Sequence, residues 1–154
     1  MASVLTTLQD QIVTRLEAQT FFSASPAITV LAENRRDLLT ELAASLGKLG
    51  VVAVVGTPSA RQDTPSKHSP PHFSRISVVT AIFENVLLNR AASGSGQPGS
   101  LVAEAVAYYL TGWTPEILGN ALLIEGIDPV ENDQYAVHEV THFTGGAITE
   151  LTRQ

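Results

Sequence analysis

A run of five apolar residues, Val51-Val52-Ala53-Val54-Val55, constrains the fold more than any other part of the chain. A strand with one solvated face alternates apolar and polar residues, so an unbroken run predicts a strand that is covered on both faces. Residues 27–33 form an earlier apolar, β-branched segment, which also predicts a strand. Between them, leucines recur at helical spacing over residues 37–49, and Gly50 follows as the stop. This order predicts a strand–helix–strand crossover unit.

The remaining periodic segments predict two more helices and three more strands. Amphipathic helices are expected over residues 4–19 and from Ser100, as N-cap, to Trp113. A long strand is expected over residues 75–89, and two closing strands are expected over residues 121–127 and 135–144, joined by a turn-rich connection at 128–133. We therefore predict one α+β domain across all 154 residues, with a mixed, mainly antiparallel sheet, long hairpin strands and about three packing helices.

Two connections are rich in turn-forming residues. Residues 57–74 contain four prolines and predict a long loop or arm, which either reaches over a binding partner or is a hairpin tip without a role. Residues 90–99 contain Gly94-Ser95-Gly96-Gln97-Pro98-Gly99 ahead of a predicted helix. No Gly-Lys-Ser/Thr triplet follows this stretch, so a flexible turn is favoured over a phosphate-binding loop.

Composition excludes several classes of function. The net charge of −6 argues against a broad nucleic-acid-binding surface, and the absence of cysteine excludes disulfides, thiolate zinc sites and cysteine nucleophiles. No membrane span and no signal-peptide pattern are expected, so a cytoplasm-like setting is the expectation. Only 16% of residues are charged and 44% are hydrophobic. Either the core is well filled, or subunit interfaces cover part of the surface, and the second reading is favoured.

His138-Glu139-Val140-Thr141-His142 matches the HExxH pattern of zinc hydrolases. On a helix, both histidines of this pattern reach one Zn²⁺ and the glutamate activates the bound water. The segment instead alternates with a period of two, is rich in strand-forming residues and is closed by Gly145-Gly146. A strand would separate the histidines by about 13 Å along its axis, too far for shared coordination. A strand is therefore favoured over the zinc-binding helix that a hydrolase of this class requires.

Other candidate site residues are equally open to structural explanations. His68, His72 and Glu150 could complete a metal site only by folding back, and no Gly-x-Ser-x-Gly elbow exists. Glu84 and Glu125 lie on different predicted strands from Glu139, where the three carboxylates could face one another or a solvated sheet face. Tyr108 and Tyr109 are expected to be core or interface aromatics. We assign no catalytic, cofactor-binding or metal-binding residue.

Several segments resemble proteins of tailed bacteriophages. The matching text consists of Leu49-Gly50-Val51-Val52 leading to Val55-Gly56-Thr57-Pro58, Glu84-Asn85-Val86-Leu87-Leu88-Asn89-Arg90, and the Ala103 to Trp113 helix ending in Thr111-Gly112-Trp113. With the order of the elements, these segments resemble the small tail terminator and tail completion proteins. The predicted helix at residues 37–49 departs from the simplest members of that family.

The resemblance implies a structural virion protein that is made in the host cytoplasm. Its members form a ring, commonly of six copies, that terminates the tail tube and joins it to the head-side connector. The resemblance implies no catalytic residues and no cofactor, and DNA would pass through the ring without specific binding. The long loop at residues 57–74 could clasp an adjacent subunit. Two alternatives stay open: a zinc hydrolase that uses residues 138–142, and a small ligand-binding module with a pocket near Trp113 and the glycine-rich loop.

Overall fold

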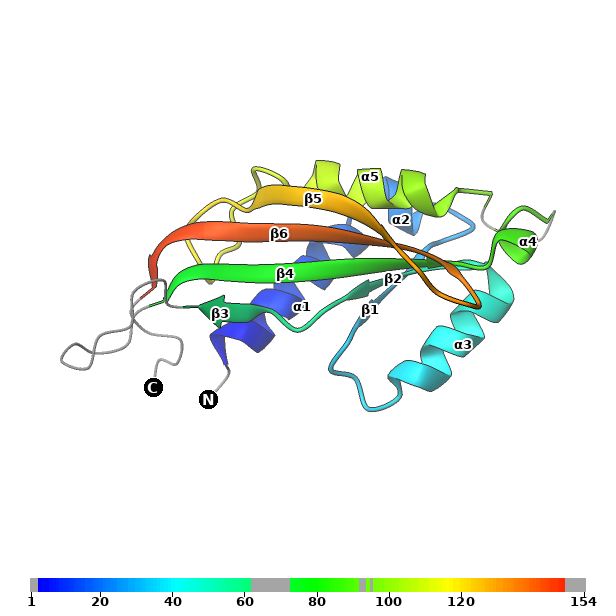
Figure 1. Cartoon of the computed structure of the whole chain (residues 1–154), viewed down its shortest axis with the longest axis horizontal. Helices are drawn as coiled ribbons and strands as arrows, with labels where there is room; N and C mark the ends of the chain where they lie inside the picture. The colour runs from blue at the N-terminus through cyan, green and yellow to red at the C-terminus, as the bar shows by residue number, and fades with distance from the viewer. Residues whose placement is uncertain (1–2, 62–72, 92–93, 95, 149–154) are drawn as a thin grey trace.

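A computed structural model describes residues 3–61, 73–91, 94 and 96–148 (Figure 1). Five helices and six strands lie in this part of the chain. In chain order the elements are α1 (Val4–Glu17), α2 (Thr20–Ser23), β1 (Thr29–Ala32), α3 (Leu38–Lys48), β2 (Val51–Val55), β3 (Ser59–Arg61), β4 (Phe73–Glu84), α4 (Val86–Asn89), α5 (Gly99–Leu110), β5 (Leu123–Val130) and β6 (Ala136–Ile148). No helix in the described part of the chain is long and apolar enough to cross a bilayer.

The strands form one mixed sheet in the order β1-β2-β4-β6-β5. The short strand β3 lies outside this order and pairs with the first part of β4. Strands β1 and β2 are parallel and the other pairs are antiparallel. The long pair of β4 and β6 lies in the middle of the sheet, with β5 along one edge (Figure 1). The predicted α+β fold with a mainly antiparallel sheet is therefore confirmed.

The crossover unit β1-α3-β2 is also confirmed. All five residues of β2 are buried, as the unbroken apolar run predicts. Val51, Ala53 and Val55 belong to the main core, whereas Val52 and Val54 pack in a smaller cluster with residues of α3 and β1. Strand β2 is apolar throughout because helices cover both of its faces.

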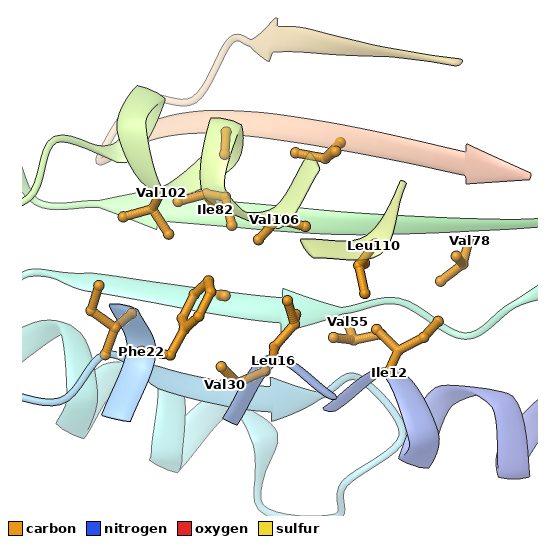
Figure 2. Packing of buried hydrophobic residues seen from close by; sticks show 14 of the residues in the cluster. Ile12, Leu16, Phe22, Val30, Val55, Val78, Ile82, Val102, Val106 and Leu110 are labelled. Atoms are coloured by element: carbon orange, nitrogen blue, oxygen red, sulfur yellow. The ribbon is translucent and has the colours of Figure 1, made fainter. Parts of the chain in front are cut away.

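The main core lies between one face of the sheet and the helices α1, α2 and α5 (Figure 2). Helix α1 contributes Leu8, Ile12 and Leu16, all fully buried. The short helix α2, which sequence patterns did not predict, adds Phe22. From α5 and the sheet, Val102, Val106, Leu110, Val78 and Ile82 point into the same core. Full burial of each such side chain stabilises the fold by about 1.5–3 kcal/mol.

Helix α3 packs on β1 and β2 against the opposite face of the sheet. Its leucines divide accordingly: Leu46 is buried, and Leu38 and Leu42 are partly buried against the sheet. The main contacts of α3 are with these two strands, so it does not cover the same face of β4 completely. An apolar groove remains beside α3.

The predicted extents of one strand and of two connections are wrong. The strand expected over residues 75–89 ends at Glu84, because the Asn85 side chain accepts a hydrogen bond from the Leu88 backbone N–H and caps the one-turn helix α4. The loop expected over residues 57–74 contains β3, which gains its backbone partners from β4; residues 62–72 lie outside the described part. The turn expected at residues 128–133 begins later, since β5 pairs with β6 as far as Val130.

Helix α5 begins without the expected Ser100 cap. Its N-cap residue is Pro98, whose side chain cannot accept a hydrogen bond. The carboxylate of Glu84 takes this role and accepts a hydrogen bond from the Gly99 backbone N–H at 3.0 Å. A residue 15 positions away in the chain thus satisfies one of the free donors at the start of the helix.

Candidate functional site

The HExxH segment lies in the middle of β6, and the strand interpretation is confirmed. His138 and His142 pair in register with Ile82 and Val78 of β4, so both side chains are on the core face. Glu139 pairs with Ala81 and points to the opposite face. The glutamate is thus separated from both histidines by the sheet, and the zinc-hydrolase geometry does not form.

No group of three or more potential metal ligands comes together within the described part of the chain. The two histidines lie four residues apart on a strand, which corresponds to about 13 Å. His68, His72 and Glu150, the other residues considered as ligands, lie outside the described residues.

His142 is a fully buried imidazole at the interface of β6 and α5. Its Nε2 atom lies 3.2 Å from the Thr111 hydroxyl oxygen, just after the end of α5. Burial lowers the pKa of His142 from 6.5 to about 4, and a hydrogen bond involving the Ala107 backbone opposes this effect only in part. His142 is therefore neutral at neutral pH and serves as a packing residue whose polar contacts are with Thr111 and the Ala107 backbone.

Glu84 is the most buried carboxylate in the described structure. Its Oε2 atom accepts a hydrogen bond of 2.6 Å from the Asn89 side-chain amide, and the guanidinium of Arg90 lies 3.7 Å away. The other carboxylate oxygen accepts from Gly99. Asn89 also donates to the Gln97 backbone oxygen at 2.6 Å. Glu84 and Asn89 together tie the end of β4 to α4 and to the start of α5.

The three glutamates considered as a possible group do not converge. Glu84 is on the core side of β4, in register with Ala136. Glu125 is on the opposite face, where it forms an ion pair of 2.6 Å with Arg75, whose guanidinium stacks over the Phe143 ring. The carboxylates therefore have separate structural surroundings, and no acid–base pair is formed among them.

A groove lies beside α3, and we call it the α3 groove. It encloses about 660 Å³. Side chains of Val79, Ala81 and Phe83 form an apolar part of its lining, and Leu38, Leu39 and Leu42 of α3 form another. The rest of the lining consists of Val54, Gly56, Thr57, Ser59, Ser77 and two carboxylates, Glu33 and Glu139. Sequence reasoning missed this groove because it depends on how far α3 extends over the sheet.

A second hollow, of about 460 Å³, lies between α1 and the segment after α5. Trp113, Arg15 and Asp10 are among the residues that line it. The Arg15 guanidinium lies 5.7 Å from the centre of the Trp113 ring, and its Nε donates to the Tyr109 backbone oxygen. The expected pocket near Trp113 thus has a counterpart here, but the glycine-rich loop contributes no residue to its lining in the described structure.

Several large apolar side chains are exposed. The most exposed are Leu87 of α4 at 88%, Leu39 of α3 at 80% and Tyr108 of α5 at 79%. Along β5, an edge strand, four more are exposed: Leu123, Ile124, Ile127 and Val130. Leu87 falls within the strand expected over residues 75–89, but the structure places it on α4. The capping pattern of Asn85 with the helix-favouring leucines after it is the signal that could have placed it on a helix.

Comparisons with known proteins add little about function. No protein-family model matches the chain, and no curated protein matches it. A solved structure whose printed name states no activity is similar over 92% of this chain and 98% of its own, with 15% identity and a TM-score of 0.47. This similarity supports no conclusion about function.

Proposed function

We propose that this protein is a structural subunit of a tailed phage or prophage. In this role, copies of the chain form a ring, of six subunits by resemblance, at the head-proximal end of the tail. The ring terminates the tail tube and joins it to the head-side connector, and DNA passes through it. The α+β fold, with its N-terminal helix, long central strands and one helix across the sheet, is compatible with the family that the sequence resembles.

The observation that carries this proposal is the distribution of exposed apolar side chains. Leu39, Leu87 and the residues of β5 lie on three different elements. A subunit of a closed ring contacts each neighbour through a different surface, so it needs apolar groups in at least two places. A monomer would leave these side chains in water.

Strand β5 supports the same proposal. It forms one edge of the sheet, and an exposed apolar edge strand favours association with another chain. Pro129 has no backbone N–H, and the pairing with β6 shifts between Ile124 and Gly126. Both features weaken addition of a further strand, so packing through side chains is the expected mode of contact.

The proposal is tested by measuring the mass of the purified protein by sedimentation equilibrium and native mass spectrometry over a wide range of concentration. A discrete ring-sized oligomer is expected, alone or with the tail tube protein. A parallel deletion of the gene in the phage or prophage is expected to block joining of tails to heads. A protein that stays monomeric under all these conditions, together with normal virions in the deletion, would refute the proposal.

The hollow beside Trp113 favours a ligand-binding module as the second candidate. Trp113 is the only tryptophan of the chain, so its fluorescence reports directly on that site. A small molecule that shifts the Trp113 emission of the wild type, but not of an Arg15→Ala variant, would support this candidate. No saturable shift across a metabolite collection would count against it.

A further inference from the structure

The α3 groove has the chemistry of a docking site for an apolar segment that carries a positive charge. Its apolar residues come from both α3 and β4. Its only charged lining residues within the described structure are Glu33 and Glu139, so no described basic side chain neutralises it from within. An apolar surface with a one-sign rim selects a partner of opposite charge.

The two carboxylates differ in how well they are satisfied. Glu33 accepts a hydrogen bond of 2.7 Å from the Thr57 backbone N–H. Glu139 is directly opposite Asp128 in the register of β5 and β6, on the same face of the sheet. Like charges directly opposite on neighbouring strands destabilise a sheet, and a cation placed beside them relieves the repulsion. A positive group of a partner therefore gains the most electrostatic stabilisation beside Glu139.

Helix α4, with the residue that follows it, presents exposed apolar side chains next to a positive charge, which complements the apolar and acidic α3 groove. Leu87 is the most exposed large apolar residue in the described structure, and Val86 beside it is also exposed. Arg90 follows directly, with more than half of its side chain exposed and only a long contact of 3.7 Å to Glu84. The helix lies at one end of the molecule, where the end of β4 leads into it (Figure 1).

Helix α4 is also held in place before any partner arrives. Asn89 is fully buried and bonds to both Glu84 and the Gln97 backbone. The Asn85 cap fixes the first turn. A one-turn helix anchored at both ends loses little conformational freedom on docking, which favours its use as a contact.

We propose that α4 of one copy docks in the α3 groove of the next copy. Leu87 packs on the apolar lining of Val79, Ala81 and Phe83, and Arg90 lies beside Glu139 and Asp128. This inference rests on the proposed ring, for which it names the lateral contact. Groove and α4 are different surfaces of the same chain, so the contact is head-to-tail and is repeated around a closed ring.

A charge exchange tests the electrostatic part. Glu139→Lys alone and Arg90→Glu alone should each weaken subunit association by about tenfold or more, because each places like charges in contact. The double variant should recover association to within about threefold of the wild type, since the pair is restored in reverse. Circular dichroism and thermal melting verify that each variant is folded. Two folded single variants that assemble like the wild type would overturn the inference.

An apolar substitution tests the packing without touching a charge. Leu87→Ser removes a side chain that is 88% exposed, so the fold of the subunit should be unaffected. If Leu87 is buried at the contact, association should weaken by about tenfold or more. Tyr108→Ser is the matched control, because Tyr108 is 79% exposed on a different helix and should have no effect. Equal effects of the two variants would contradict the assignment.

Cross-linking gives a direct readout, because the wild-type chain has no cysteine. A Leu39→Cys, Leu87→Cys double variant joins the groove of one copy to α4 of the next. Oxidation should produce a ladder of covalent multimers that ends at the ring size, whereas each single variant should stop at a dimer or stay monomeric. Rings without this ladder, and with no response to the charge exchange, would overturn the inference and leave the proposed function standing. A monomer in every assay would refute both.

Discussion

Acidification should destabilise this protein through His142. The folded chain holds the pKa of this buried imidazole at about 4, whereas its ordinary value is 6.5. Between these two pH values the unfolded chain binds a proton that the folded chain does not bind. The stability that depends on neutral His142 is therefore complete above pH 6.5 and is lost progressively as the pH falls to about 4.

The size of the effect follows from the gap between the two pKa values. At roughly 1.4 kcal/mol for each pKa unit, the gap corresponds to about 3 kcal/mol, most of which is lost by pH 4.5. A domain of this size has a free energy of unfolding of about 5–15 kcal/mol, so the loss is readily measured. The Thr111 hydroxyl, 3.2 Å from Nε2, cannot compensate for the desolvation of a charged ring.

The measurement is urea unfolding at pH 7.5 and pH 4.5, at one protein concentration, for the wild type and for His142→Gln. Between the two pH values the wild type should lose about 2–3 kcal/mol more stability than the variant, because glutamine does not titrate. His138→Gln serves as the control, since it alters the same strand and face while it leaves His142 in place. If wild type and His142→Gln show the same dependence on pH, the buried, neutral state of His142 is wrong.

Two further predictions concern the packing at the end of β4. Gly50→Ala should destabilise the fold by about 2–4 kcal/mol, because Gly50 has φ of +80° and an added Cβ would lie 2.6 Å from the Asn89 Cα. Gly112 has the same φ but open space around it, so Gly112→Ala should lose only about 1 kcal/mol of stability. Equal melting temperatures for the two variants would contradict the packing argument. Glu84→Gln should cost about 1–3 kcal/mol in urea unfolding, since a buried carboxylate loses charge-assisted hydrogen bonds. Glu104→Gln, at an exposed position of α5, should cost almost nothing.

Much of the secondary structure was predictable because the relevant signals are local. The apolar run at residues 51–55 requires a strand that is covered on both faces, and β2 is buried throughout. Alternation over residues 135–144 was sufficient to place the HExxH segment on a strand rather than on a zinc-binding helix. In both cases the period of the side-chain pattern distinguishes the two structures before any tertiary contact is considered.

One error came from a missed local signal and another from a distant residue. The Asn85 cap turns the chain into α4 directly after Glu84, and the buried Glu84 then meets Asn89 and Gly99. Ser100 is a good cap by its type, yet Glu84 occupies that role from another element. Propensity cannot anticipate such exchanges, because they depend on which segments the sheet brings together.

The candidate site shows the same division. The sequence alone determined that the chain is an α+β protein, that His138 and His142 lie on a strand with Glu139 on the other face, and that no cysteine chemistry is possible. Only the tertiary structure decided that β4 lies between β2 and β6, that α3 leaves a groove on that face, and that Leu87 is exposed. The physical reason is that side-chain periodicity is a property of neighbouring residues, whereas strand order, helix coverage and exposure are properties of segments packed together.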